Sequence, residues 1–253
     1  MEPAGLLDEP AGDKARQRRL DSRLLELARF DHLVDAKATS QTATSGTRFQ
    51  TWPEGTRLKE RLAARSSVGD SSEMPSPPRD IAPGFHHVWV NATGDWDYFL
   101  DEVDRMVWVR RLVQTMARVP WSCVAFCQMS THVHLLLRID DTSLSVGMRE
   151  LNREYSRHFN LHHGRVGTFV RGRFGSRRID DGGDLLNVYA YVVGNPVRAG
   201  ACRRTDEWAW SSYRTTFGLS HDFPFVEAAP VIAEAGGQEP LRQFVQSRLG
   251  NRA

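Results

Sequence analysis

The chain has 253 residues, of which 40% are hydrophobic and 25% charged, and its formal net charge is +2 at pH 7. This composition is ordinary for a soluble globular protein, and so small a net charge does not by itself establish nucleic-acid binding. The three cysteines form no paired CxxC motif, which argues against a disulfide framework or a cysteine-rich zinc site. No apolar run approaches the roughly 20 residues that cross a bilayer, and the N-terminus does not resemble a signal peptide. We therefore expect a cytoplasmic protein without membrane contact.

The first 80 residues differ from the rest of the chain. A potential amphipathic helix carries Leu20, Leu24, Leu27 and Phe30 among several arginines, and polar, Ser/Thr-rich and Pro-rich stretches follow it. These stretches have no apolar period from which a core could form. We predict a partly helical, mostly disordered extension over 1–80, a folded domain over 81–218, and a C-terminal tail with a short helix over 219–253.

The folded domain shows a regular succession of elements. A strand at 85–90 is followed by a helix that Asp101 caps and Pro120 closes, with Met106, Val109, Val113 and Met116 on its inward face. Strands at 122–128 and 132–139, a helix at 144–163, an Arg/Gly-rich segment with strand character and a helix at 184–194 complete the series. This order predicts an α+β fold, a ferredoxin-like antiparallel sheet with helices on one face.

His132 and His134 are the sharpest local signal. Alternate residues of a strand share a face, so the two imidazoles lie roughly 7 Å apart on one side, and they can serve as a pair of metal ligands. The alternative is an exposed strand face that carries two histidines without function. A phosphate hydrolase with three alternating histidines is disfavoured, because Leu136 occupies the next position on that face.

Tyr191 and Asn195 form the second signal. They are four residues apart at the end of the last predicted helix, so a phenol and a carboxamide share one face, and Pro196 places Asn195 at the helix end. The alternative is that Tyr191 packs in the core while Asn195 caps the helix. Tyr155 is a rival nucleophile, but its spacing from other apolar residues is typical of a buried helix face.

An arginine-rich segment is the third signal. Its guanidinium groups can neutralise phosphates, its phenylalanines can stack on bases, and its glycines let the backbone approach a nucleic-acid strand. The alternative is a solvated strand-and-turn surface. The candidate DNA-binding residues are Arg165, Arg171, Arg173, Arg177, Arg178 and, further along the chain, Arg198.

Several motifs in this order resemble the REP-associated tyrosine transposases, a branch of the single-tyrosine HUH transposases (histidine, hydrophobic residue, histidine; the insertion-sequence-200-like family). The resemblance covers about residues 74–217. Its landmarks are Pro83-Gly84-Phe85-His86-His87-Val88, Thr131-His132-Val133-His134-Leu135-Leu136-Leu137, Leu151-Asn152-Arg153-Glu154-Tyr155, Gly164-Arg165-Val166-Gly167, Arg171-Gly172-Arg173-Phe174, Tyr191 with Asn195-Pro196-Val197-Arg198-Ala199-Gly200, and Trp210-Ser211-Ser212-Tyr213.

The resemblance implies that 81–218 is a transposase catalytic domain. It assigns Tyr191 as the nucleophile and His132, His134 and Asn195 as ligands of Mg²⁺ or Mn²⁺. It implies a partner in single-stranded or hairpin repetitive palindromic DNA, which the enzyme cleaves through a 5′-phosphotyrosine link and rejoins, in DNA transposition or recombination. The protein is then expected in the cytoplasm, associated with the nucleoid, as a monomer or homodimer.

Two departures from the family pattern are visible. Ser130-Thr131 stands where the family often has Pro-Asn, and Asn91-Ala92-Thr93-Gly94 replaces its polar, Arg-containing turn, which puts one DNA contact in doubt. Neither removes a catalytic group. Two alternatives stay open: a domesticated DNA-binding protein of this fold without turnover, and a replication or mobilisation nuclease with a similar metal and tyrosine site.

Overall fold

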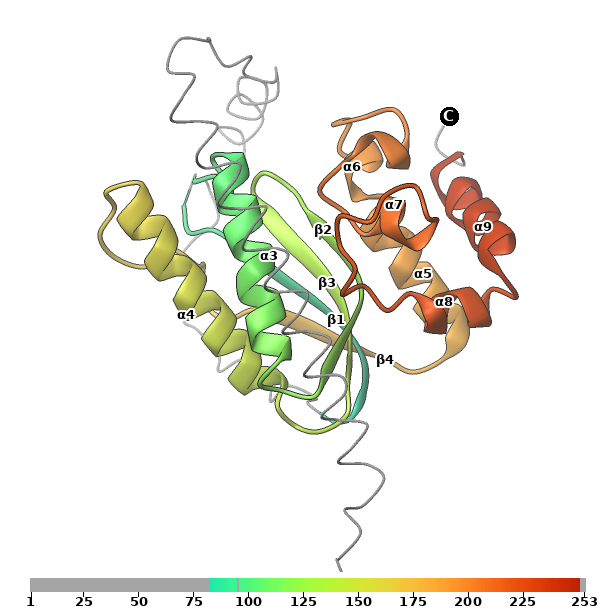
Figure 1. Cartoon of the computed structure of the whole chain (residues 1–253), viewed down its shortest axis with the longest axis horizontal. Helices are drawn as coiled ribbons and strands as arrows, with labels where there is room; N and C mark the ends of the chain where they lie inside the picture. The colour runs from blue at the N-terminus through green and yellow to red at the C-terminus, as the bar shows by residue number, and fades with distance from the viewer. Residues whose placement is uncertain (1–81, 95, 251–253) are drawn as a thin grey trace, which may run out of the picture.

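The computed structural model describes residues 82–94 and 96–250, and these form one sheet with a helical layer on each side (Figure 1). The predicted N-terminal helix and extension lie outside the described residues. The sheet is antiparallel throughout, with the order β2-β3-β1-β4. Its strands are β1 (Gly84–Asn91), β2 (Trp121–Gln128), β3 (His132–Ile139) and β4 (Gly175–Ile179).

The pairing of β1 with β3 assigns side chains to the two faces of the sheet. Val88 pairs with Leu135 and His87 with Leu136, and alternate residues of each strand point to opposite sides. One face therefore carries the valines of β1 and the odd-numbered leucines of β3. The opposite face carries His87 and Trp89 from β1, with His132 and His134 from β3.

Helices α3 (Glu102–Met116) and α4 (Leu144–His162) cover the apolar face. The side chain of Asp101 accepts a hydrogen bond from the Asp104 backbone, which caps α3 as predicted. Gly147 of α4 lies against the ring of Trp121, where an added Cβ would come within 2.3 Å. The α4 helix therefore packs closely on the sheet at this point.

A second helical layer covers the other face of the sheet. Its central helix is α5 (Gly182–Val193), which Asp181 caps, and its buried residues pack against Leu136 of β3. Val231 and Leu241 from the last part of the chain are fully buried in the same cluster. The remaining elements of this layer are α6 (Asn195–Arg198), the 3₁₀ turn η1 (Thr205–Glu207), α7 (Tyr213–Thr216), α8 (Ala229–Glu234) and α9 (Gln238–Gly250).

The predicted α+β class and antiparallel sheet are confirmed, with α3 and α4 together on one face. The layer of α5 to α9 adds helices to the opposite face, so the site residues lie between two layers instead of on an open sheet surface. The C-terminal segment predicted as a tail over 219–253 contains α8 and α9. None of the helices among the described residues is long and apolar enough to span a membrane.

Candidate active site

His132 and His134 share one face of β3, as their spacing predicted, and this is the face that α5 covers. Their ring centroids lie 4.9 Å apart. The Nδ1 atom of His132 lies 2.9 Å from the Thr131 hydroxyl oxygen. When that nitrogen donates its proton to Thr131, the Nε2 atom is left with a lone pair that a metal ion can take.

His87 is a third imidazole of the site, which the sequence pattern did not reveal. It reaches across from β1, and its Nε2 atom lies 3.1 Å from Nδ1 of His134. If His134 donates from Nδ1 to His87, the Nε2 atom of His134 is also left for a metal ion. Both histidines of the predicted pair therefore have a hydrogen-bond partner on the same ring nitrogen.

Tyr191 lies over this group of histidines. Its ring meets His134 edge-on with centroids 5.3 Å apart, and it meets His87 in the same manner at 5.6 Å. The side chain is 44% exposed, so its phenol is open to a substrate. The Arg198 guanidinium lies 4.6 Å from the ring centroid and donates a hydrogen bond to the Tyr191 carbonyl. Arg198 thus fixes the ring and the end of α5 together.

Tyr155 is a core residue, as its spacing predicted. It lies on the other face of the sheet, fully buried, and its hydroxyl donates a 2.6 Å hydrogen bond to the carbonyl of Tyr98. Burial raises the pKa of Tyr155 well above its usual value. Tyr191 is therefore the tyrosine with both an accessible phenol and neighbouring histidines.

Asn195 begins α6, one turn beyond Tyr191. Its amide nitrogen is buried and has no hydrogen-bond partner in the part of the chain that the structure describes. A 180° rotation of the carboxamide exchanges its nitrogen and oxygen, so the same position can present an oxygen ligand. A buried amide without a partner among the described residues, one helical turn beyond Tyr191, is compatible with a third ligand for a divalent ion.

The histidines of the site are held in their neutral form. Burial lowers the pKa of His134 to about 2, with further lowering by His132, His87 and Arg198. Burial and the nearby Arg177 lower the pKa of His87 to about 4, and burial also lowers the pKa of His132. Neutral imidazoles are the form that binds metal, so these residues need lose no proton before an ion enters at pH 7.

The candidate DNA-binding arginines occupy different positions. The Arg171 backbone donates to the carbonyl of Asn91, and Asn91 pairs with His132, so the exposed Arg171 and Arg173 lie on a segment next to the end of β1 that pairs with the start of β3. Arg177 makes two hydrogen bonds of 2.7 and 2.9 Å to Asp184.

Two further arginines lie away from the histidines. Arg178 alternates with Arg177 along β4 and lies on the other side of the sheet. Arg165 is half-buried, with its guanidinium 4.4 Å from the ring centroid of Trp96. The assignment of all six arginines to DNA contacts stays a prediction.

The expectation that phenylalanines of this segment stack on bases is wrong. Phe169 and Phe174 are 1% and 7% exposed and belong to the core on the α3 and α4 side. Both rings pack inside the protein, so neither has a free face for a base. The arginine-rich composition of the segment gave no sign of this burial. Trp96, which is 45% exposed beside Arg165, is the aromatic surface available nearby.

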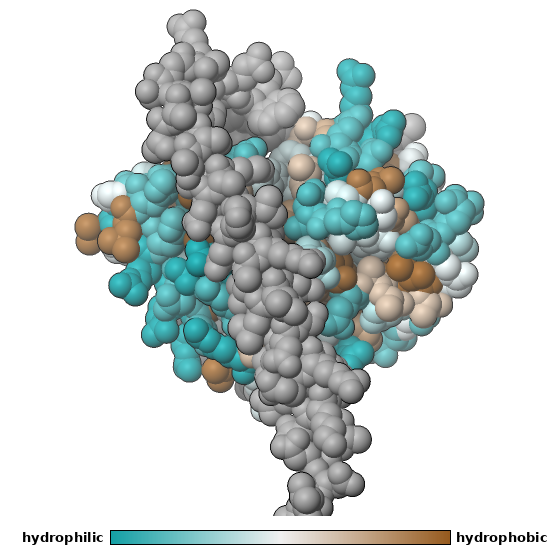
Figure 2. Space-filling view, viewed as in Figure 1, coloured by the Kyte–Doolittle hydropathy of each residue, from teal (hydrophilic) through white to brown (hydrophobic). Residues whose placement is uncertain are grey.

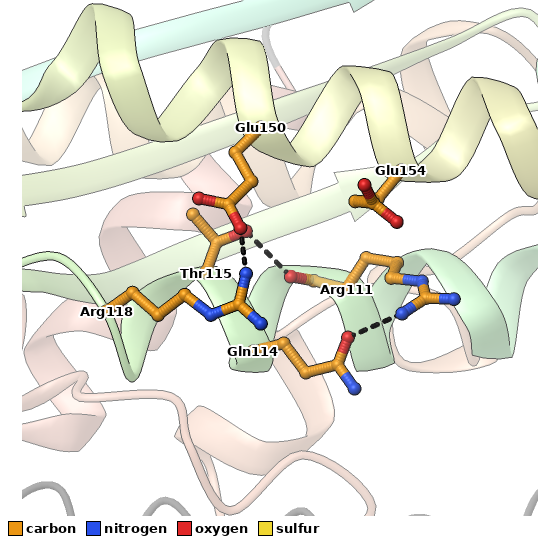
Figure 3. A pocket seen from close by; sticks show the side chains of 6 residues that line it. All are labelled: Arg111, Gln114, Thr115, Arg118, Glu150 and Glu154. Atoms are coloured by element: carbon orange, nitrogen blue, oxygen red, sulfur yellow. Dashed lines mark hydrogen bonds and ion pairs between the residues drawn. The ribbon is translucent and has the colours of Figure 1, made fainter.

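A cavity of about 150 Å³ lies elsewhere, between α3 and α4 (Figure 3). Charged and polar side chains line it, among them two linked pairs: Arg118 pairs with Glu150 and Arg111 donates to Gln114. The cavity lies on the face of the sheet opposite to Tyr191. We therefore place the candidate active site at the histidines and not in this cavity.

The fold and site together define a class: an α+β domain whose sheet presents a histidine pair to a tyrosine carried by a covering helix. No family model matches the sequence. A protein of Haemophilus influenzae named as a REP-associated tyrosine transposase is 27% identical over 111 residues, which cover 40% of this chain and 63% of that protein.

A solved structure supports the same assignment at the level of the fold. It is a REP-associated tyrosine transposase bound to a REP hairpin, with a TM-score of 0.51 and 18% identity, covering 59% of this chain and 90% of that one. The chain therefore resembles the REP-associated tyrosine transposases in sequence and in fold, as its motifs predicted.

Proposed function

We propose that this chain is a metal-dependent DNA strand transferase that cleaves and rejoins single-stranded or hairpin DNA through Tyr191. The contact of Tyr191 with His134 carries this proposal, because it brings a helix-borne phenol to the strand-borne histidine pair. Imidazole and carboxamide side chains can bind metal ions. This supports a divalent ion, Mg²⁺ or Mn²⁺, held by His132, His134 and Asn195. Such an ion would supply Lewis-acid polarisation of the scissile phosphate.

The residues of the chain provide the remaining chemistry. A phenol is a weak nucleophile near neutral pH, so Tyr191 needs a polarised phosphate and a defined approach. Arg198 limits the motion of its ring. The Tyr191 oxygen forms a bond to phosphorus while the bond from phosphorus to the 3′ oxygen breaks, and the leaving oxygen takes up a proton. A 5′-phosphotyrosine link and a free 3′-hydroxyl result, and a later attack by a 3′-hydroxyl reverses the link without a nucleotide cofactor.

His87 and Thr131 act in this proposal as positioning residues. Each offers an acceptor to Nδ1 of one histidine of the pair, which would leave both Nε2 atoms with a lone pair for an ion. Thr131 fills the position where related sequences often carry asparagine, and its hydroxyl provides the hydrogen bond there. The departure from the family pattern therefore leaves the local chemistry in place.

The DNA partner is inferred from the distribution of charge. Arg171 and Arg173 are exposed on the segment that joins β1 at Asn91, the partner of His132, so phosphates on either side of the scissile bond would pass near them. An unpaired strand or hairpin can bend its backbone into a site that lies between a sheet and a helix. We expect the protein to act on such DNA in the cytoplasm, at the nucleoid.

The experiment is covalent capture of a labelled hairpin, drawn from repeats of the host genome, in Mn²⁺. Tyr191→Phe removes the nucleophilic oxygen and should abolish the covalent product, while hairpin affinity changes by less than about threefold. Tyr155→Phe is the matched control, because it removes a tyrosine hydroxyl from the buried side of the sheet and should retain the product.

Three outcomes would contradict the proposal. Retained attachment in Tyr191→Phe would place the nucleophile elsewhere. Hairpin binding without any cleavage by the unsubstituted chain in Mn²⁺ would instead indicate a DNA-binding protein of this fold that has no turnover. Strong preference for origin or transfer DNA over repeats would favour a replication or mobilisation nuclease.

A further inference from the structure

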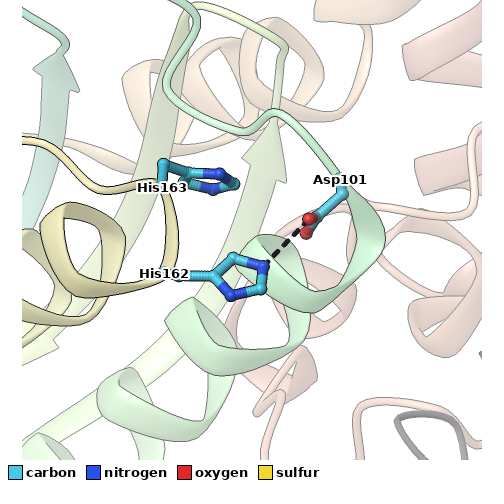
Figure 4. A group of neighbouring side chains, drawn as sticks. All are labelled: Asp101, His162 and His163. Atoms are coloured by element: carbon cyan, nitrogen blue, oxygen red, sulfur yellow. Dashed lines mark hydrogen bonds and ion pairs between the residues drawn. The ribbon is translucent and has the colours of Figure 1, made fainter. Parts of the chain in front are cut away.

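A second group of imidazoles and carboxylates lies where the end of α4 meets the start of α3 (Figure 4). His162 Nε2 lies 3.1 Å from Asp101 Oδ2, and Figure 4 shows these two side chains pointing toward each other. One potential ligand atom each from Asp101, His162 and His163 lies within 4.8 Å of the other two. Since α3 and α4 cover the face opposite to α5, this group is separate from His132 and His134.

Two aspartates concentrate negative charge at this point. Asp104 is fully buried, and its carboxylate accepts a 2.9 Å bond from the Leu100 backbone and faces His163 Nε2 at 2.9 and 3.0 Å. Asp101 uses Oδ1 to cap α3 and directs Oδ2 to His162. The first turn of the helix offsets part of this charge. Each carboxylate also faces an imidazole: Asp101 faces His162, and Asp104 faces His163.

His158 adds a third imidazole to the group. Its Nε2 atom is buried without a hydrogen-bond partner among residues 82–94 and 96–250, and it lies 3.8 Å from Asp104 Oδ1. Its ring stacks on that of His162 with centroids 5.4 Å apart. Within the described part of the chain, the group therefore holds an imidazole nitrogen without a hydrogen-bond partner next to a buried carboxylate.

We propose that Asp101, His162 and His163 bind a divalent transition-metal ion, with Zn²⁺ as the preferred occupant. Two imidazoles and one carboxylate suit Zn²⁺, whereas Mg²⁺ prefers oxygen ligands. Ligands around tetrahedral Zn²⁺ lie about 3.3 Å apart, and His162 and Asp101 are already near this separation. Asp104 would orient His163 as a hydrogen-bond acceptor, the role that carboxylates commonly take beside metal-binding histidines.

Such an ion would link the start of α3 to the end of α4. The segments next to these two helix ends also touch each other, through Trp96 and Arg165. His162 and His163 lead directly into the loop of Arg165, whose backbone donates to the Asn160 carbonyl at 2.7 Å. Asp101 follows the segment of Trp96, and the guanidinium of Arg165 lies 4.4 Å from that ring centroid. Binding of Zn²⁺ is therefore expected to stabilise the fold. It should also hold the exposed Trp96 ring and the Arg165 guanidinium in place.

The test uses the full chain with His132→Ala and His134→Ala, so that the candidate active site cannot hold an ion. Calorimetric titration should give one Zn²⁺ per chain, Co²⁺ should give the visible absorption of a tetrahedral site, and Zn²⁺ should raise the Tm. Adding His162→Gln should weaken Zn²⁺ binding at least about 100-fold. Adding His221→Gln, an exposed histidine near the C-terminal layer, should leave Zn²⁺ binding unchanged.

Asp101→Asn is a second variant that keeps a residue able to cap α3, so loss of Zn²⁺ binding there cannot be ascribed to an unfolded helix. The proposal is wrong if the chain lacking His132 and His134 binds no Zn²⁺. It is also wrong if His162→Gln lowers the Tm equally with Zn²⁺ and with a chelator, which would identify a metal-free ion-pair clamp. Neither outcome depends on whether Tyr191 is the nucleophile.

Discussion

At the scale of single residues, the candidate metal ligands of the site differ from the residues that orient them. His132 and His134 each engage Nδ1 in a hydrogen bond, one with Thr131 and the other with His87. A hydrogen bond at this nitrogen determines which tautomer is present and how the ring is turned. The two partners come from a loop residue and a neighbouring strand, so the ligand geometry depends on the pairing of β1 with β3.

This arrangement makes the effect of His87→Ala predictable. Loss of the acceptor at His134 should weaken Mn²⁺ binding about 10–100-fold, because ring orientation and tautomer are then no longer held. His87→Gln keeps an acceptor near the same position and should recover part of the affinity. Mn²⁺ binding can be measured by electron paramagnetic resonance, without any requirement for catalysis, and His221→Gln is the control. Equal affinity in His87→Ala and the unsubstituted chain would remove His87 from the site.

At the scale of elements, the sequence predicted the helices and strands that are marked by a nearby capping residue or by alternation of polar and apolar residues. Asp101 indicated the start of α3, and alternation in β3 placed His132 and His134 on one face. The start of α5 was expected at Asp184, two residues late, although Asp181 is its cap. A cap depends only on residues within one helical turn, so Asp181 could also have been identified from the sequence alone.

Features that depend on the pairing of distant segments were not predicted. His87 belongs to the site only because β1 pairs with β3 in one particular register, and a one-residue slip would turn it to the other face. The burial of Phe169 and Phe174 depends on a loop that runs back along the end of β1. Two signals pointed to His87: its alternation with Phe85 and Trp89 along the strand, and its place in the first landmark of the family resemblance.

Packing of α4 on the sheet gives a prediction at this scale. A methyl group at Gly147 would lie 2.3 Å from Trp121, whose indole nitrogen is itself held by a 3.0 Å hydrogen bond to Ser143. Gly147→Ala should therefore lower the free energy of unfolding by about 1–2 kcal/mol, even though alanine favours helices. Urea unfolding measures this change.

Gly183→Ala in α5 is the matched variant, because its added methyl group would meet only Asp181 Oδ1 at 3.4 Å. It should be neutral or stabilising by up to about 1 kcal/mol. A stable Gly147→Ala variant, with an unfolding free energy equal to that of the unsubstituted chain, would contradict the close packing of α4 on Trp121.

At the scale of the whole molecule, the neutral histidines should make stability depend on pH. An unperturbed imidazole has a pKa of 6.5, whereas His87 in the folded protein has a pKa of about 4. Between these values the unfolded chain binds more protons than the folded one. The free energy of unfolding should therefore fall as pH drops through this window, by up to about 1.4 kcal/mol per pH unit for each such histidine.

Urea unfolding at about pH 7.5 and about pH 5 measures this dependence in the absence of metal. His87→Gln removes one of the titrating groups and should reduce the loss of stability between the two conditions. His221→Gln, which replaces an exposed histidine, should leave the loss as it is. A His87→Gln variant with an undiminished pH dependence would show that His87 does not titrate as its buried position requires.

The position of the exposed arginines predicts how DNA binding responds to salt. Removing one arginine that neutralises a phosphate should reduce the slope of log affinity against log salt by about 0.7 for a single strand. Arg173→Ala should show such a reduction in a hairpin titration. Arg149→Ala, an exposed arginine of α4 on the opposite layer, should not. Identical salt slopes for both variants would place the DNA path away from Arg173.

The proposed chemistry depends on which tyrosine attacks the DNA, and the covalent product can be located directly. The unsubstituted chain is incubated with a hairpin substrate and Mn²⁺, digested with nuclease and protease, and the modified peptide is identified by mass spectrometry. The account predicts a 5′-linked nucleotide on Tyr191, within the peptide that contains α5. An adduct on any other residue, with Tyr191 unmodified, would contradict it.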